Sequence, residues 1–166
     1  MLNKIFNNLS PIFYLQIWEN RIKVTEITSN KIFDESPLIA IKKNDKGEET
    51  VTAVGNNVKL MQNELDIEVI NPFSHPRTLI SNFMAAEKVL QYIIKTLSKH
   101  KLLAAPPLTV IHPMEKLDGG MTQIEFRAFK ELALGAGSRE AVVYDGPELN
   151  VYDFNFIDIK KKEKVP

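Results

Sequence analysis

Leu108-Thr-Val-Ile-His-Pro113 opens the stretch that decides the fold, which runs on to Pro147. Apolar and β-branched residues fill this first segment and a proline stops it, which predicts a buried strand. A helix should follow, with Thr122 as its N-cap and Glu125 three residues later at capping-box spacing. Ala141-Val-Val-Tyr144 then predicts a second buried strand, which a right-handed crossover would return parallel to the first. The stretch therefore predicts a strand–helix–strand unit.

The helix of this unit has one apolar side. Ile124, Ala128 and Leu132 share a face, with Phe129 and Ala133 beside it. A helix with such a face can lie on a sheet, so we expect these residues to be buried.

Hydrophobic periodicity places the other elements earlier in the chain. Two hairpins are expected first, and the second turns at residues 44–47, which read Asn-Asp-Lys-Gly. A long helix with a broad apolar stripe should begin after Ser81 or Asn82. Hairpins followed by strand–helix–strand predict an α/β fold of the ribonuclease-H-like kind. The expected strands cover residues 12–18, 22–27, 37–41, 49–54 and 67–70, with helical turns at 56–61 and the long helix at 83–99.

Composition excludes several classes of function. The 166 residues carry 44% hydrophobic and 25% charged residues, which suits one globular domain. The formal net charge is zero, so the basic surface that a nucleic-acid partner requires is not expected. There is no cysteine, and the three histidines lack ligand spacing, so no metal site is expected. Neither a membrane-spanning run nor a signal peptide is present, which predicts a cytoplasmic protein.

Several segments in register carry a resemblance to a known family. Thr122-Gln-Ile-Glu-Phe-Arg-Ala128 and Leu134-Gly-Ala-Gly-Ser-Arg-Glu-Ala-Val142 resemble MreB, the bacterial actin homologue that determines rod shape. Earlier segments at 33–41, 53–61 and 87–93 resemble the family in the same order. The resemblance covers residues 1–147, the first half of the family. It implies domain I of an actin-type ATPase, a mixed sheet of hairpins and a β-α-β unit with helices packed on it.

The resemblance also implies a nucleotide site, and the chain departs from it there. In the family the first hairpin supplies a metal-binding aspartate and a glycine-rich phosphate turn. Gln16 stands at the aspartate position, Trp18 at the glycine position, and Glu19 follows. A neutral amide is a poor magnesium ligand, an indole blocks close approach by phosphate, and a carboxylate repels it. The second half of the family is missing too, so we expect no ATPase activity and no cofactor.

One family catalytic residue has a match. Glu125 aligns with the glutamate that the family uses to position the attacking water, and a capping-box role is the structural alternative. Gly119-Gly120 follows a strand end, where ligands often bind. These residues leave open a residual nucleotide-binding or small-ligand-binding enzyme.

Two terminal segments flank the central domain at residues 11–147, and the C-terminal one, residues 148–166, diverges from the family. Residues 1–10 form an amphipathic segment, with Leu2, Ile5, Phe6 and Leu9 on one helical face. This face predicts either docking on the domain or a weak membrane-surface contact, at the inner face of the membrane. Residues 148–166 predict a strand, at about 151–159, and a basic tail. The candidate interface residues of that strand are Val151, Phe154 and Phe156.

The sequence therefore predicts a non-catalytic, MreB-like half-actin that works through protein contacts in cell-shape or cytoskeletal assembly. The predicted partner is a protein, either a full-length MreB or one of its assembly factors, in a homodimer or a hetero-complex. A division or pilus scaffold of the FtsA or PilM type is an alternative.

Overall fold

The computed structural model describes residues 10–98 and 105–166 and contains two sheets. The larger sheet is mixed, with strand order β3-β2-β1-β7-β8. Its first three strands are antiparallel, whereas β7 runs parallel to both β1 and β8. The parallel return that the sequence predicts is therefore confirmed. The five strands are β1 (Ile12–Ile17), β2 (Ile22–Glu26), β3 (Lys31–Glu35), β7 (Leu108–Pro113) and β8 (Glu140–Val143).

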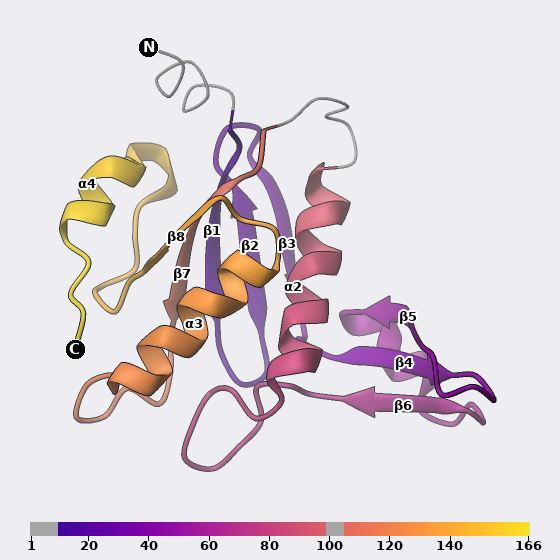
Figure 1. Cartoon of the computed structure of the whole chain (residues 1–166). Helices are drawn as coiled ribbons and strands as arrows, with labels where there is room; N and C mark the ends of the chain where they lie inside the picture. The colour runs from indigo at the N-terminus through magenta and orange to yellow at the C-terminus, as the bar shows by residue number, and fades with distance from the viewer. Residues whose placement is uncertain (1–9, 99–104) are drawn as a thin grey trace.

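The smaller sheet projects from one end of the larger one (Figure 1). Its order is β5-β4-β6, and it packs a short 3-10 helix, η1, against a small core. The β4–β5 turn follows the expected chemistry, because Asn44 Oδ1 accepts hydrogen bonds from the backbone of Lys46 and Glu48 while Gly47 has a φ of 78°. The elements are β4 (Ile39–Lys43), β5 (Glu49–Val54), η1 (Asn56–Met61) and β6 (Ile67–Ile70).

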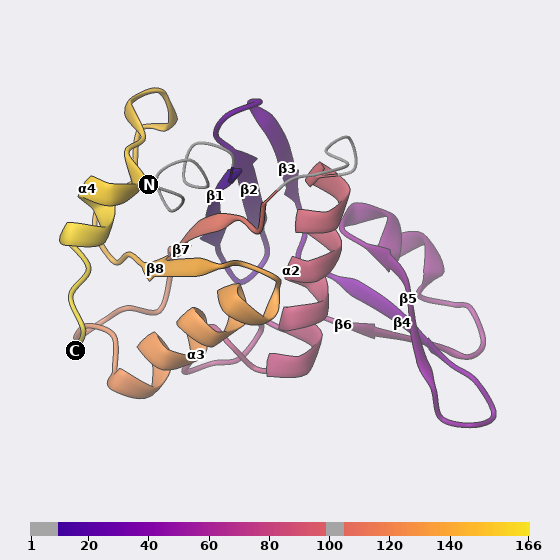
Figure 2. The same cartoon turned by 45° about the horizontal axis from the view of Figure 1, so that its top comes forward.

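Two helices, α2 (Phe83–Ser98) and α3 (Gln123–Gly135), cover one face of the larger sheet (Figures 1 and 2). The Asn82 side chain accepts a hydrogen bond of 3.0 Å from the Ala85 backbone and caps α2. Thr122 and Glu125 form the predicted capping box of α3. One expectation is wrong: Ile124 is 81% exposed, because the buried face of α3 begins at Phe126.

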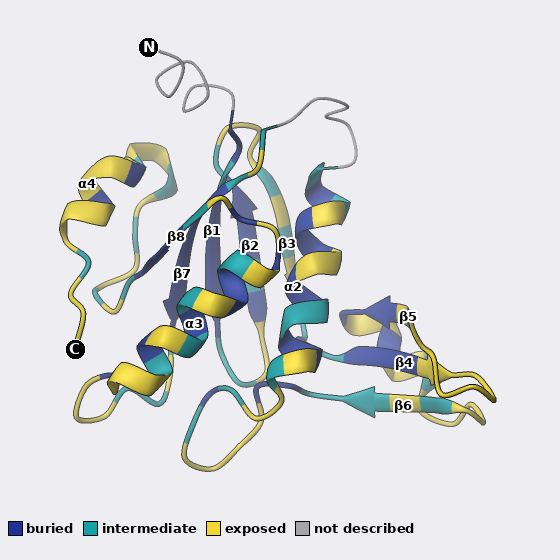
Figure 3. Ribbon diagram, in the orientation of Figure 1, coloured by how far each residue is buried: buried dark blue, intermediate teal, exposed yellow. Residues whose placement is uncertain are grey.

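Alternate residues of β1 face opposite sides of the sheet, as strand geometry requires. Phe13, Leu15 and Ile17 belong to the main core, whose other side is built from α2 and α3. Tyr14 belongs to a second cluster on the opposite face, together with Val110 and Val142. Because both faces of the central strands are covered, Figure 3 shows these strands as buried. The outer parts of the smaller sheet are exposed.

The C-terminal segment covers that opposite face, and its predicted structure is wrong. Residues 151–159 do not form a strand: they contain a 3-10 helix, η2 (Val151–Asp153), and a short α-helix, α4 (Phe156–Lys161). Two asparagines cause this, because Asn150 caps η2 and Asn155 caps α4 through their side-chain oxygens. The predicted basic tail also changes, since Lys160 and Lys161 are the last turn of α4.

Candidate functional site

The β1–β2 hairpin carries the residues that stand at the phosphate-loop positions. Trp18 donates a backbone hydrogen bond of 2.9 Å to Arg21 O and closes the turn. The Arg21 guanidinium lies 4.9 Å from the centre of the Trp18 ring, a cation–π contact. It also donates two hydrogen bonds of 2.7 Å to Asp34 on β3. The indole is therefore held in place at the turn.

Glu19 connects this turn to two other loops. Its carboxylate lies 2.7 Å from Lys116 Nζ and accepts a hydrogen bond of 2.9 Å from Ser74 Oγ. Its carbonyl oxygen accepts a bond of 2.9 Å from the Asn71 side chain, and its N–H donates to Glu115. The hydrogen bonds from Lys116 and Ser74 hold the pKa of Glu19 below its ordinary value. A charged carboxylate is thus fixed at this position.

Gln16 lies in β1, two residues before Trp18, and is completely buried. Its Nε2 donates a hydrogen bond of 2.8 Å to the Glu148 carboxylate. Its Oε1 is buried without a hydrogen-bond partner. The Glu148 carboxylate can only accept a hydrogen bond, so it fixes the orientation of the Gln16 amide. The amide NH2 group faces Glu148, and the amide oxygen faces away from it.

A buried polar cluster lies beside Gln16 on the same face. Tyr14 Oη and His112 Nδ1 are 2.7 Å apart, and the Leu149 backbone N–H donates to Tyr14 Oη across 3.2 Å. The direction of this bond follows the His112 tautomer: an unprotonated Nδ1 accepts from the Tyr14 hydroxyl, whereas a protonated Nδ1 donates to it. The His112 and Tyr144 rings pack nearly perpendicular to each other, at 77° with centroids 4.9 Å apart.

Burial sets the titration of this cluster. Desolvation raises the pKa of Tyr14 to about 12, and desolvation lowers the pKa of His112. A hydrogen bond to the Gly146 backbone and the charges of Glu148 and Asp145 oppose the shift of His112 but do not reverse it. Both side chains are neutral at pH 7, so the cluster locks the 145–149 loop onto the sheet without buried charge.

Glu125 lies away from Gln16, at the start of α3. Its Oε2 accepts hydrogen bonds of 2.9 Å and 2.8 Å from Thr122 N and Oγ1. The capping-box alternative is therefore confirmed in geometry. Gly119 and Gly120 precede it with φ values of 84° and 88° in a turn that Gly120 N closes on Leu117 O. The structure does not bring Glu125 together with Gln16, Trp18 or Glu19 through any hydrogen bond among the described residues.

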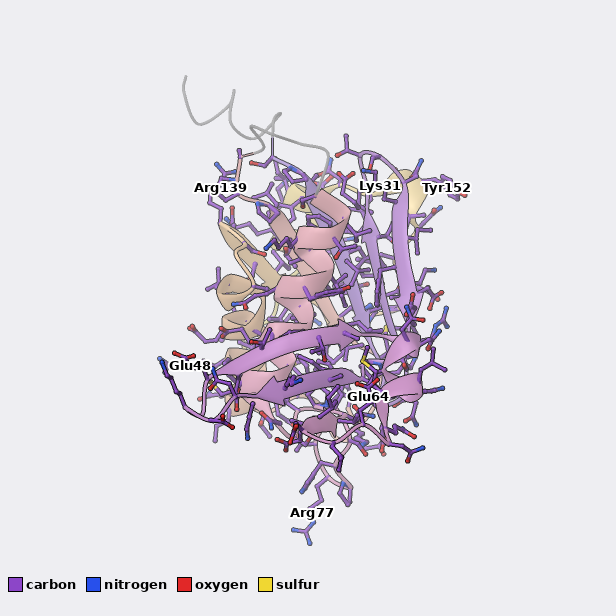
Figure 4. All side chains as sticks on the ribbon, turned by 90° about the vertical axis from the view of Figure 1, so that its right-hand side faces the viewer. Lys31, Glu48, Glu64, Arg77, Arg139 and Tyr152 are labelled. Atoms are coloured by element: carbon purple, nitrogen blue, oxygen red, sulfur yellow. The ribbon has the colours of Figure 1, made fainter. Side chains whose placement is uncertain are left out.

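The predicted C-terminal interface residues pack against the sheet to different degrees. Phe156 is 5% exposed and belongs to the cluster of Tyr14, so it lies inside the chain rather than on a surface open to a partner. Val151 and Phe154 are half-buried against the same cluster. Tyr152 between them is 90% exposed, and Figure 4 places it on the side of the larger sheet away from α3. The N-terminal candidates Leu2, Ile5, Phe6 and Leu9 lie outside the described residues.

Two kinds of feature are not found in the part of the chain that the structure describes. No group of three His, Asp or Glu side chains is placed to hold a metal ion within residues 10–98 and 105–166. In the same ranges no helix combines the length and the apolar character needed to cross a membrane.

Comparison with known families decides the relationship. Residues 21–151 match the family described as MreB/Mbl protein. The chain belongs to the MreB/Mbl family. It is 33% identical over 119 residues to the cell shape-determining protein MreB of Pasteurella multocida, covering 70% of this chain and 32% of that protein. The MreB of Escherichia coli K12 is 32% identical over 120 residues. The chain therefore spans about a third of the length of these relatives.

Solved structures agree on the fold. MreB5 of Spiroplasma citri bound to ADP matches with a TM-score of 0.59 at 19% identity, over 82% of this chain and 38% of that one. The predicted actin-like fold of domain I is thus confirmed. The sequence did not point to the Tyr14–His112 pair, the Glu148 contact or the loops around Glu19. The one available signal was that Tyr14, Gln16 and His112 are polar residues within strands that are mostly apolar.

Proposed function

We propose that this MreB-family chain acts through protein contacts in cell-shape or cytoskeletal assembly, and that it does not bind ATP with magnesium. The observation that carries the second part is the buried amide of Gln16, which is hydrogen-bonded to Glu148 at the position where the family resemblance implies a metal-binding aspartate.

The residues at the hairpin do not fit a magnesium–phosphate group. Gln16 donates an N–H to Glu148, and the oxygen left for a metal ion, Oε1, belongs to a neutral amide. Magnesium favours carboxylates and water in near-octahedral geometry, so this amide is a weak substitute. Trp18 places an indole, held by Arg21, where a phosphate turn needs bare backbone. Glu19 adds a carboxylate that Lys116 holds in place, and this carboxylate would repel phosphate oxygens.

Calorimetry with ATP and magnesium tests this part. We expect no measurable binding heat at micromolar to millimolar nucleotide, with a full-length MreB as the positive control in the same buffer. Saturable binding in the micromolar range would overturn it, and so would nucleotide-dependent shifts of the Gln16 and Trp18 amide resonances. Saturable binding lost in Glu125→Gln would instead favour the residual enzyme that uses Glu125 and the Gly119-Gly120 turn.

The assembly role rests on the family and on the surface of the C-terminal segment. The curated relatives are cell shape-determining proteins, and a solved MamK structure with the same fold is described as a double helical filament. That match has a TM-score of 0.58 at 10% identity, over 81% of this chain and 41% of that one. Val151 and Phe154 are half-buried, and the 90% exposed Tyr152 between them gives the segment an apolar surface. The partner we propose is a full-length MreB or a second copy of this chain, at the cytoplasmic face of the membrane.

Co-sedimentation with full-length MreB filaments tests the assembly role. We expect the chain to pellet with filaments, and Tyr152→Asp to weaken this several-fold. Leu65→Asp is a matched control, because Leu65 is 91% exposed and lies before β6, on the smaller sheet. Pelleting that is insensitive to Tyr152→Asp but lost in Leu65→Asp would move the interface to the smaller sheet. No pelleting, together with a monomer in sedimentation velocity, would overturn the assembly role.

A further inference from the structure

An apolar groove of about 380 Å³ opens between α4 and the amino ends of β1 and β7. Its apolar walls come from Ile12, Leu108, Phe154, Phe156 and Ile157. The volume falls near the lower end of the range of ~300–1,000 Å³ found for ligand pockets. Glu140 and Lys160 form an ion pair at its edge. The groove is thus an apolar slot with a polar rim.

The groove leaves apolar side chains of its own chain open to water. Ile157 is 58% exposed although its neighbour Phe156 is buried. Ile12 and Phe154 are half-buried. Exposed apolar atoms gathered around one slot favour an occupant that covers them.

Residues 1–9 are that candidate because of where they join the described chain. The Leu108 N–H donates a hydrogen bond of 2.9 Å to Pro11 O, so the chain enters β1 beside Leu108. Ile12 and Leu108 are both walls of the groove. Any segment that precedes Ser10 therefore starts at the mouth of the slot. Nine residues in a helix would measure about 13 Å.

The sequence of that segment suits an apolar slot. Leu2, Ile5, Phe6 and Leu9 recur at the spacing of one helical face, and the remaining positions hold Met1, asparagines and a lysine. Burying four such side chains removes the apolar surface of both partners from water. The effective concentration of a segment tethered at the groove mouth is high, so even weak contacts hold it.

We propose that residues 1–9 bind in cis to the groove between α4 and the β1–β7 edge through the apolar side chains Leu2, Ile5, Phe6 and Leu9. The same four side chains cannot lie in this groove and in a bilayer together. Occupation of the groove therefore competes with membrane contact. The proposal holds whether or not the chain binds nucleotide or filaments.

Hydrogen exchange on the full chain tests this in both directions. The double variant Leu2→Asp/Phe6→Asp should speed exchange several-fold across residues 154–160. Asn3→Asp/Asn7→Asp adds the same charge at the same spacing but off the apolar face, and should leave these residues unchanged. In the reverse direction, Ile157→Asp should speed exchange within residues 1–9. Tyr152→Asp, outside the groove, should not.

The reciprocal effect separates docking from local fraying of α4, since fraying leaves residues 1–9 unaffected. Unchanged exchange at 154–160 in Leu2→Asp/Phe6→Asp would overturn the proposal. So would protection of residues 1–9 that arises only on anionic lipid vesicles and is insensitive to Ile157→Asp, because that result assigns the segment to the membrane.

Discussion

The side-chain amide of Gln16 donates a hydrogen bond of 2.8 Å to the carboxylate of Glu148, 132 residues further along the chain. Gln16 is completely buried in the central strand, whereas Glu148 is an exposed loop residue. A residue at a position that the family resemblance assigns to metal binding thus holds the C-terminal segment on the sheet.

Removing this acceptor should destabilise the fold. Glu148→Ala leaves the buried Gln16 Nε2 without a partner, which should lower the free energy of unfolding by about 1–3 kcal/mol. Glu68→Ala, which removes only an exposed ion pair with Lys43, should change it by less than about 1 kcal/mol. Urea unfolding measures both. In the background of Gln16→Leu, Glu148→Ala should lose most of its effect, and equal losses in both backgrounds would contradict the contact.

His112 should make stability fall as the pH drops through the range just below 7. Burial holds its pKa in the folded chain below the ordinary value of about 6.5, so the unfolded chain binds a proton that the folded chain rejects. The slope should stay below about 1.4 kcal/mol per pH unit, which is the limit for one proton, and it should vanish below the folded pKa. His112→Gln should flatten it between pH 7 and 5.5 in urea unfolding. Hydrogen bonds from Lys116, Arg21 and Lys88 lower the pKa values of Glu19, Asp34 and Glu49, so these carboxylates change the stability only in more acidic solution. An unchanged slope in the variant would refute the assignment to His112.

The parts of the fold that local chemistry determines could be predicted from the sequence. The capping box of Thr122 and Glu125 and the turn at Asn44 need only neighbouring residues, and both are confirmed. The long helix from Phe83 needs only its apolar stripe and the cap at Asn82. In each case the information lies within a few positions of the element.

The structural features that the sequence predicted wrongly, or did not predict, depend on competing local signals or on contacts between distant residues. Residues 151–159 alternate like a strand, but the caps at Asn150 and Asn155 outweigh this and bury Phe156 and Ile159 three positions apart on α4. Strand β3 was not predicted, because its exposed edge position leaves it without a buried apolar run. The Glu148 partner of Gln16 was also beyond the sequence, since nothing local indicates a contact across 132 positions.

Gly55 should not tolerate a side chain. Its φ is 94°, and an added Cβ would lie 2.1 Å from the Glu35 Oε2, which accepts a hydrogen bond from Asn56 N. Gly55→Ala should lower stability by about 2–4 kcal/mol, through backbone strain plus this clash. Gly47→Ala is the control, since φ there is 78° and nothing lies within 4 Å of the new Cβ. Its loss should be about 1 kcal/mol, from strain alone. Equal melting shifts for the two would show that the clash is relieved by movement of Glu35.

The Glu125 carboxylate should matter for stability through the α3 cap. Thr122→Ala should lower the free energy of unfolding by about 1 kcal/mol, since it removes the bond to Glu125 N. Glu125→Ala should cost a similar amount, whereas Glu125→Gln keeps an acceptor for the Thr122 backbone and should cost less. Thermal unfolding ranks the three. A large loss in Glu125→Gln alone would show that the negative charge, rather than the cap, is needed.

The parallel pairing of β1 with β7 affects how the chain folds during its synthesis. Residues 12–17 sit at the centre of the larger sheet, yet their neighbours on one side are residues 108–113. During synthesis the first hairpin emerges early and must wait for roughly a hundred further residues before its open edge is covered. Until then β1 exposes unpaired backbone and the apolar side chains of Phe13 and Leu15. Truncations before residue 108 should therefore aggregate rather than fold.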